Sequence, residues 1–474
     1  MLNRKAKLSI LSLVLVFVLF SGFGCRCVSR EVQEKMQPIK LTYWRVWDGP
    51  DAFAEILDRY RALHPFITIE YRKLRYDEFE QALIEAFAAD RGPDIFSIQN
   101  TWIRKYKEMD LLAPMPASIT MAYPVVKGSI KKEVVTELRT TPSISLKQLK
   151  ADFIDVVYKD VVINEFDERV GAYVEKVYGL PLFIDTLAVY YNNDLFNNAG
   201  ITTPPAYWNR EFQQDVKKLT KQDNKGQIIQ SGVALGGGDN VDRSSDILSI
   251  LMMQNGTEMI NDRGSVMFSQ RPADFENKNI IPGLDALRFY VDFSNPAKEV
   301  YCWNNNLGNS MDMFLQNKLA MMFGYAYMMP QIRADAPKLK FSVAELPQIE
   351  GNPQNTNFAN YWAEVVSRKS RYSSEAWDFV QFITRAEQAK SYLAQAKKPP
   401  ALRALVDEMK EDKEIGVFVG QTLTAESWYR GVDANAAEAI MREMIDDVVT
   451  GKKTLEDALK LGAQKVQQTI NKKE

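Results

Sequence analysis

The stretch IKLTYWRVW, residues 39–47, is the first of three short apolar stretches that decide the fold class. It is rich in aromatic and β-branched residues, which is typical of a buried strand. Residues 53–63 then place apolar side chains at helical spacing, and residues 67–71 alternate as a second strand. A second helical segment, 79–87, leads to a third strand, DIFSI at 94–98. The order β-α-β-α-β predicts an α/β protein whose sheet is covered by helices.

Length and composition describe a globular chain of two or three domains. The chain has 474 residues, 46% hydrophobic and 25% charged, which argues against a mostly disordered or polytopic membrane protein. The 59 basic and 61 acidic residues give a net charge of −2, so we expect no nucleic-acid partner. The single histidine, His64, disfavours a metal site, and three cysteines cannot form a disulfide framework.

Residues 1–24 are predicted to be a targeting signal. A basic start precedes residues 8–20, which are apolar except for two serines. A helix of that length is shorter than a ~30 Å hydrocarbon core, and small residues follow it, as in a secretory signal. The segment resembles a bacterial lipoprotein signal, which implies that Cys25 carries a lipid; Cys27 is a second candidate, and an uncleaved anchor is the alternative. Either way, the rest of the chain is expected to be extracytoplasmic and anchored to the cell membrane, in the periplasm or at the cell surface, with residues 25–38 as a polar tether.

The middle of the chain is harder to interpret. Between about 115 and 177 we find no clear strand rhythm and expect helices at Ser145–Tyr158 and Glu165–Val177. Residues 180–191 read as two strand pieces around Asp185. A run of three glycines at 236–238 is not followed by the lysine of a phosphate-binding loop, so we interpret it as an ordinary loop.

Four segments together carry a resemblance to a known family. The most specific is YGLPLFIDTLAVYYNNDLFNNAGI, residues 178–201, followed by two prolines at 204–205. The others are GPDI at 92–95, FLQNKLAM at 314–321 and SEAWDFVQFI at 374–383. Within the third, Asn317 stands where the family usually has glycine. In this order and spacing the segments resemble the family 1 extracellular solute-binding proteins, the maltose-binding-protein-like capture subunits of ABC sugar importers.

The resemblance implies a two-lobed periplasmic-binding-protein fold of type II, with a sheet flanked by helices in each lobe and a ligand cleft and hinge between them. The expected division is 39–180 for the first part of lobe 1, with a helical insertion at about 115–177, then 181–340 for most of lobe 2. Residues 341–395 return to lobe 1, and 396–474 form a C-terminal helical segment that completes lobe 2 or the hinge. The resemblance also implies a non-enzymatic function: the protein would capture a carbohydrate of oligosaccharide type by lobe closure and deliver it to ABC transporter permease subunits. We expect it to be a monomer and to need no cofactor or metal.

Aromatic rings can cover the apolar face of a pyranose, while carboxylates and amides bind its rim of hydroxyls. We therefore take as candidates the aromatic and polar residues in loops and at element ends that match ligand-contacting segments of the family. The ligand-binding candidates are Asp48, Asn100, Thr101, Trp102, Asp185, Asp239, Asn240, Trp303, Tyr325, Tyr327, Tyr361, Trp362, Trp428, Tyr429 and Arg430.

Two other classes of function stay open at this stage. A surface glycoside hydrolase needs two carboxylates about 5–10 Å apart in a cleft, and the sequence holds many acidic residues. It shows no nucleophile elbow, HExxH motif or P-loop, however. The third class is an adhesion or assembly lipoprotein with the same fold and a degenerate cleft. A binding protein would return its sugar unchanged, whereas an adhesion protein would show no melting-temperature shift with small ligands.

Overall fold

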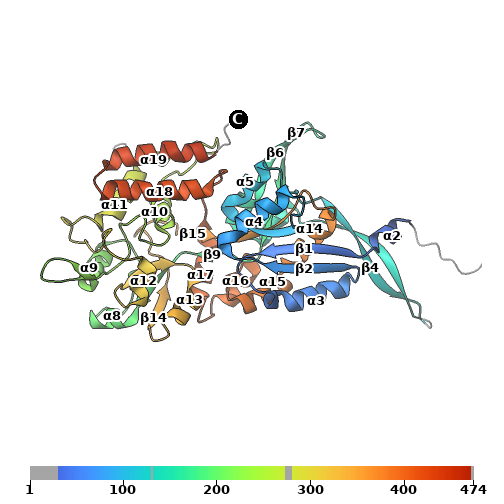
Figure 1. Cartoon of the computed structure of the whole chain (residues 1–474), viewed down its shortest axis with the longest axis horizontal. Helices are drawn as coiled ribbons and strands as arrows, with labels where there is room; N and C mark the ends of the chain where they lie inside the picture. The colour runs from blue at the N-terminus through green and yellow to red at the C-terminus, as the bar shows by residue number, and fades with distance from the viewer. Residues whose placement is uncertain (1–29, 130–131, 273–279, 471–474) are drawn as a thin grey trace, which may run out of the picture.

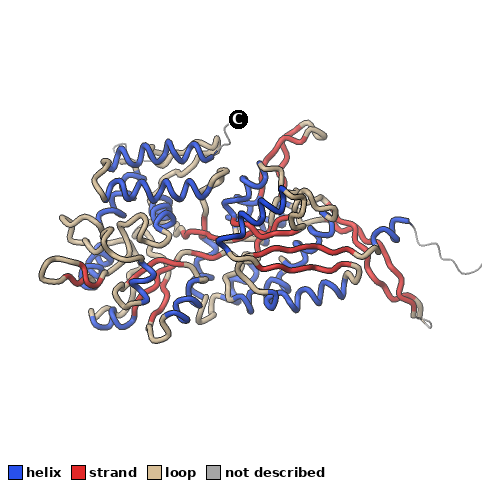
Figure 2. Tube along the Cα trace, viewed as in Figure 1, coloured by secondary structure: helices blue, strands red, loops and turns tan. Residues whose placement is uncertain are grey.

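The chain folds into two lobes, each a β-sheet flanked by helices, in a computed structural model that describes residues 30–129, 132–272 and 280–470 (Figures 1 and 2). This confirms the predicted α/β class and the two-lobed architecture. Cys25 and Cys27 lie outside the described residues. Among the residues that are described, no helix is both long and apolar enough to cross a membrane.

Lobe 1 is built on a five-stranded sheet with the order β2-β1-β3-β16-β8. β1 runs parallel to β2 and β3, as the β-α-β-α-β pattern predicts, while β16 is antiparallel to both β3 and β8. The strand bounds are Ile39–Arg45 (β1), Ile67–Lys73 (β2), Ile95–Gln99 (β3), Leu180–Pro181 (β8) and Trp362–Val366 (β16).

Helices cover both sides of this sheet (Figure 1). α3, α14 and α15 pack against one another, and α4 and α5 lie on the opposite side from α3. The helix bounds are Ala54–Leu63 (α3), Tyr76–Ala88 (α4), Ile103–Glu108 (α5), Ser373–Ile383 (α14) and Ala386–Ala396 (α15), with short 3-10 turns at Pro50–Phe53 and Asn100–Trp102.

Lobe 2 has a smaller sheet, β13-β10-β14, in which both outer strands are antiparallel to β10. Its strands are Ala188–Asn192 (β10), Met321–Gly324 (β13) and Phe341–Ala344 (β14), with a separate pair at Lys221–Gln222 (β11) and Ile228–Gln230 (β12). Its helices are Asn193–Asn198 (α8), Arg210–Leu219 (α9), Ser244–Gln254 (α10), Pro282–Asp292 (α11), Ser310–Leu315 (α12), Met328–Asp335 (α13), Ala434–Val449 (α18) and Leu455–Ile470 (α19). α18 and α19 pair with each other and pack on α10 and α11.

A third small sheet, β17-β15-β9, lies between the lobes (Figure 1). β9 (Asp185–Thr186) leads from β8 of lobe 1 to β10 of lobe 2, and β15 (Asn357–Asn360) leads directly into β16. β17 (Ala425–Glu426) follows α16 (Arg403–Met409), α17 (Gly416–Gln421) and a 3-10 turn at Thr422–Thr424, and it precedes α18. The chain therefore passes between the lobes through neighbouring strands, which is the arrangement of a hinge.

The expected helical insertion is only partly helical. α6 (Leu146–Asp152) and α7 (Asp155–Val161) match the first predicted helix, and α6 begins with a Ser145/Gln148 capping box. The helix predicted at Glu165–Val177 is wrong, because β6 (Val162–Asp167) and β7 (Ala172–Val177) form a hairpin there. The turn contains Gly171 at φ +68°, a left-handed conformation that glycine adopts without strain. A second hairpin, β4 (Ser118–Lys127) with β5 (Glu133–Pro142), projects from lobe 1 (Figure 1).

The predicted tether is also shorter than expected. Residues Arg30–Lys35 form helix α2, which packs against β4 and β5 instead of forming an extended linker. Lys35 reaches Glu375 of α14 at 2.6 Å and ties this helix to lobe 1. In the turn where the family usually has glycine, Asn317 takes the left-handed conformation at φ +57°, which asparagine tolerates better than most residues.

Candidate functional site

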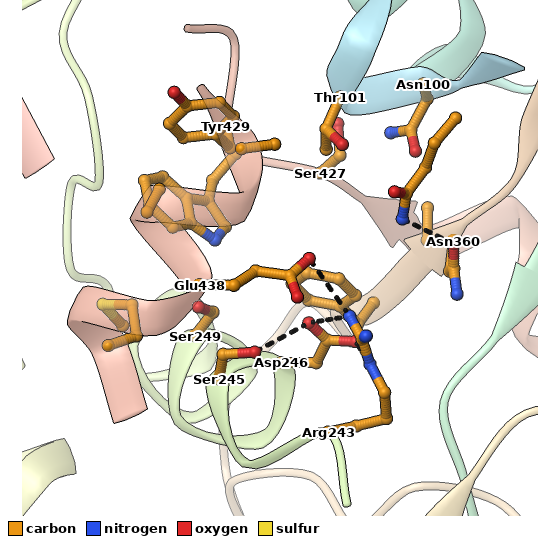
Figure 3. A pocket seen from close by; sticks show the side chains of 17 residues that line it. Asn100, Thr101, Arg243, Ser245, Asp246, Ser249, Asn360, Ser427, Tyr429 and Glu438 are labelled. Carbon is orange, nitrogen blue, oxygen red and sulfur yellow. Dashed lines mark hydrogen bonds and ion pairs between the residues drawn. The ribbon is translucent and has the colours of Figure 1, made fainter. Parts of the chain in front are cut away.

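Two neighbouring cavities lie where the lobes meet, and Gln99, Arg243 and Asn360 line both of them. The roomier cavity holds about 140 Å³ and is lined by Trp47, Tyr76, Gln99, Phe183, Asp185, Arg243, Tyr327, Asn360, Trp362 and Lys398. The narrower one, of about 30 Å³, is drawn in Figure 3 and lies among the 3-10 turn after β3, helix α10, the segment at 427–429 and helix α18. Residues of both lobes and of the hinge sheet thus converge on one cleft.

Aromatic rings form the walls of the larger cavity. Trp47 lies two residues after the end of β1 and is 37% exposed. Its ring stacks on Tyr76 of α4 (5.2 Å between centroids) and on Tyr327 of lobe 2 (5.7 Å), and Trp362 meets it edge-on at 6.0 Å. Tyr327 in turn stacks on Tyr325 at 5.9 Å. A ladder of parallel rings therefore crosses the cleft from one lobe to the other.

Asp185 is the acidic group of this cavity and fixes the position of Tyr327. One carboxylate oxygen accepts hydrogen bonds from the Thr186 and Ala326 N–H groups, both at 3.0 Å, and the other accepts from the Tyr327 N–H at 3.3 Å. Burial raises the pKa of Asp185 to about 7, although these backbone donors act in the opposite direction. The side chain joins the hinge strand β9 to the segment just before α13.

Lys398 brings a buried cation to the same cavity. Its Nζ lies 2.9 Å from both oxygens of Asp48 and 4.3 Å from the centre of the Phe183 ring. Tyr392 donates to Asp48 at 2.7 Å, and Arg45 lies 3.4 Å away. Burial would raise the pKa of Asp48, but Arg45 and Lys398 outweigh it and lower that pKa, while burial lowers the pKa of Lys398. Asp48 therefore lies behind the residues that line the cavity and holds Lys398 in place.

Arg243 separates the two cavities and is held by carboxylates (Figure 3). It lies just before α10 with φ +58°, and its guanidinium makes two bonds to Asp246, at 2.8 and 2.9 Å. Glu438 of α18 lies 3.4 Å from it, and Tyr325 donates to Asp246 at 2.5 Å. These contacts orient Arg243 toward the cleft while balancing its charge.

A buried carboxylate, Asp160 of α7, supports the narrow cavity from the lobe 1 side. It accepts hydrogen bonds from Asn100 and Tyr361, both at 2.9 Å, and from Ser427 at 2.6 Å. Arg430 pairs with it at 3.0 Å. Two of these partners, at 427 and 430, belong to the segment between β17 and α18, so Asp160 ties the insertion of lobe 1 to the C-terminal segment.

The structure brings seven of the fifteen predicted ligand-binding residues into the cleft wall: Asn100, Thr101, Asp185, Tyr327, Trp362, Trp428 and Tyr429. The Thr101 hydroxyl is buried and has no hydrogen-bond partner within the described chain. A further five lie one layer behind and contact lining or neighbouring residues: Asp48, Trp102, Tyr325, Tyr361 and Arg430.

Three predicted residues lie elsewhere, which corrects the expectation for them. Trp303 is fully buried in the core of lobe 2, where its indole N–H donates to Asn240 at 2.9 Å. Asn240 also donates to two backbone carbonyls, so this pair closes a loop. Asp239 is exposed next to the carboxyl group of Asp446, whose pKa is raised by burial and further by the neighbouring Asp239. A tryptophan at the end of a helix or strand can pack into the hydrophobic core as readily as it can line a cleft.

Several lining residues were not predicted from sequence: Trp47, Tyr76, Phe183, Gln99, Arg243, Asn360, Lys398 and Glu438. Trp47 and Gln99 carry a signal that could have found them, because each lies at the end of a strand of lobe 1 next to a predicted residue. Lys398 has none, since it meets Asp48 across 350 residues of chain. Among the described residues, no group of three or more His, Cys, Asp and Glu side chains is placed to hold a metal ion.

Comparison with known proteins assigns the chain to a family. The model of the bacterial extracellular solute-binding protein family matches residues 47–390, and the chain belongs to that family. A putative binding protein of Brucella abortus is 23% identical over 391 residues, covering 81% of this chain and 78% of that protein.

Solved structures agree on the fold. The cyclic α-maltosyl-1,6-maltose binding protein from Arthrobacter globiformis superposes with a TM-score of 0.66 at 18% identity, covering 91% of this chain and 99% of that one. An ABC substrate-binding protein from Listeria monocytogenes in complex with cycloalternan gives 0.63 at 18% identity, covering 91% and 99%. At these identities the likeness establishes the two-lobed fold.

Proposed function

We propose that this protein captures a carbohydrate of oligosaccharide type in the cleft and delivers it to the permease of an ABC transporter. The observation that carries the proposal is the pairing of aromatic walls with a polar rim. Trp47, Tyr327 and Trp362 offer flat apolar faces, while Asp185 and Arg243 offer an acceptor and a donor beside them. That combination suits a sugar ring, whose faces are apolar and whose rim is hydroxylated.

The relatives support the same ligand class. Two similar structures are named for, or bound to, cyclic oligosaccharides, and a relative from Streptococcus mutans, 24% identical over 243 residues, is a multiple sugar-binding protein. The family consists of solute-binding proteins, which favours capture over turnover. We therefore propose that the bound saccharide is released unchanged.

Closure of the lobes is the proposed mechanism of capture. The ring ladder joins Trp47 of lobe 1 to Tyr327 of lobe 2, and the cavity around it, about 140 Å³, is smaller than the ~300–1,000 Å³ of ordinary ligand pockets. An oligosaccharide therefore needs the lobes to separate at the β17-β15-β9 sheet before it enters. The proposed lobe boundaries follow those predicted from the sequence with one correction, because β14 (Phe341–Ala344), expected to return to lobe 1, pairs with β10 in the sheet of lobe 2.

We further propose that the protein is a monomer held at the outer face of the cell membrane through a lipid on Cys25. The basic and apolar residues before Cys25 support this, as does the extracellular character of the family. Cys25→Ala should move the protein from the membrane fraction to a precursor or released form. Unchanged acyl labelling of that variant would refute Cys25 as the lipidated residue and point to Cys27.

The binding proposal is tested by calorimetric titration with linear and cyclic gluco-oligosaccharides. Wild-type protein should bind at least one of them, and Trp47→Ala should bind it much more weakly. The matched control is Tyr372→Ala, because Tyr372 has the same exposure of 37% but does not line the cleft. Chromatography of the titrated sugar should return it intact, and cleavage products would instead support a glycoside hydrolase.

A further inference from the structure

The β4–β5 hairpin has two different faces. The strands pair over ten positions, from Ser118 opposite Pro142 to Lys127 opposite Glu133, a length of about 34 Å. Paired residues of an antiparallel ribbon share a face, and successive residues alternate between faces. One face carries the pairs Val126–Val134, Pro124–Thr136, Ala122–Leu138 and Thr120–Thr140, none of them charged.

Charge is confined to the other face. There Lys127 reaches Glu137 at 2.6 Å, and Arg139 lies 3.5 Å from the same carboxylate. Near the base, this charged face also carries Ile119 and Met121, which are buried against lobe 1. The base is thus fixed to the protein body, while the outer part of the ribbon extends away from it (Figure 1).

The uncharged face is exposed in its outer part. Val126 is 61% exposed and Val134, directly opposite, is 71% exposed. Lys132, just before β5, is exposed beside them. An isolated two-stranded ribbon is only marginally stable in water, and its open edges invite association. Exposed apolar side chains with lysine at their margin are the features of a segment that lies in a membrane interface.

Helix α2, at the start of the described chain, lies close to both the hairpin and the predicted lipid anchor. Helix α2 begins at Arg30, packs on both strands of the hairpin, and is tied to lobe 1 through Lys35. Cys25 is only five residues before Arg30, and five residues span at most about 18 Å. A lipid on Cys25 therefore holds the bilayer surface within that distance of α2. In Figure 1 helix α2 and the β4–β5 hairpin lie at the same end of the molecule.

We propose that the uncharged face of the β4–β5 hairpin, centred on Val126 and Val134, lies on the lipid bilayer surface and forms a second membrane contact beside the N-terminal anchor. The inference rests on the membrane anchoring in the proposed function. A short tether and a docked hairpin together fix the orientation of lobe 1 on the membrane, so that the cleft keeps a constant direction. The charged face, with its Lys127–Glu137 pair, remains toward water.

The test uses the full-length lipidated protein in vesicles of phosphatidylcholine and phosphatidylglycerol, with an NBD fluorophore on a cysteine at position 126 (Val126→Cys). Cys27→Ser removes the other N-terminal thiol, and Cys302 is buried and does not compete, since burial raises the pKa of its thiol to about 12. The matched control is Val170→Cys at the tip of the β6–β7 hairpin, which is 66% exposed. Vesicle flotation measures anchoring separately.

With the protein on vesicles, the probe at 126 should shift to shorter emission wavelength and be quenched several-fold more than the probe at 170 by a spin-labelled lipid. Adding Val134→Glu should abolish that difference while leaving carbohydrate affinity unchanged. Equal behaviour of the two probes on floated vesicles would overturn the proposal while leaving the anchor intact. A blue shift without lipid quenching would mean that protein, such as a second copy, covers the face, and would also overturn it. Failure to float would refute the anchor and the docking together.

Discussion

Trp47 shows how a single side chain can serve recognition instead of stability. It is the central ring of the ladder Tyr76–Trp47–Tyr327 and remains 37% exposed. Trp303, which the sequence suggested for the cleft in its place, is fully buried and bonded to Asn240. Both tryptophans lie at loop or element-end positions, so sequence position alone does not separate the two roles.

Trp47→Ala should weaken saccharide binding by about 30-fold or more, because losing a stacked ring and its contact area costs ~2 kcal/mol. The ligand-free protein should lose only about 1 kcal/mol of stability. Trp303→Ala should do the reverse, lowering stability by about 3–5 kcal/mol through a core cavity. Calorimetry and chemical denaturation of both variants check this. Wild-type affinity in Trp47→Ala would remove it from the site.

Asp185 should make stability depend on pH in a defined direction. Its folded pKa of about 7 lies above its ordinary value of 3.8, so the stability that it contributes is complete below about pH 4 and is lost as the pH rises toward 7. Asp185→Asn cannot ionise, so the difference in unfolding free energy between wild type and variant should shift in favour of the variant across that window. Denaturation at pH 4, 5.5 and 7.5 measures it; a constant difference would show that Asp185 is already ionised at pH 4.

At the scale of elements, the sequence predicts regular strands and helices well and insertions poorly. The strand at 39–47 and its two successors are found as predicted, because buried parallel strands form apolar runs bounded by turns. The segment expected as a helix at Glu165–Val177 is a hairpin. Its charged residues obscure the alternation of apolar and polar side chains that would have indicated a strand on each side of the Gly171 turn. Long-range partners of the site, such as Lys398 with Asp48, leave no local pattern at all.

The stability of the protein should depend far more on Asp160 than on Asp155, the two aspartates of helix α7. Asp160 is buried with four polar partners, whereas Asp155 is exposed and pairs with Arg403. Asp160→Ala leaves Arg430 and the other partners without their acceptor and should cost about 3–5 kcal/mol, while Asp155→Ala should cost less than about 1 kcal/mol. Urea denaturation compares them. Equal losses would contradict the assigned role of Asp160 in joining the insertion to the C-terminal segment.

At the scale of the whole molecule, a narrow sheet of three neighbouring strands joins the two lobes, and the proposed closure turns about it. The ring ladder and the Arg243–Glu438 pair then gather residues from distant parts of the chain at the closed cleft. The family assignment over residues 47–390 and the two-lobed fold agree with this architecture. The sequence does not predict which residues contact each other across the cleft, because those contacts form only where the two lobes approach each other.

Ligand should shift the balance between open and closed lobes, since only the closed form surrounds it. Distance measurements between spin labels at Asp51 in lobe 1 and Glu443 in lobe 2, both at the surface of their elements, should move to one shorter population when a bound saccharide is added. Trp47→Ala should need more saccharide for the same shift. If the distance distribution stays the same when a saccharide that is known to bind is added, capture by closure is contradicted.

The central claim, that the cleft lined by Trp47, Tyr327, Trp362 and Asp185 binds a carbohydrate, is tested most directly by native mass spectrometry with a panel of linear and cyclic oligosaccharides. The wild-type protein should retain at least one saccharide of the panel in a one-to-one complex of unchanged sugar mass, and Trp47→Ala with Trp362→Ala should lose it. Retention of the same saccharide by the double variant at wild-type affinity would contradict the account.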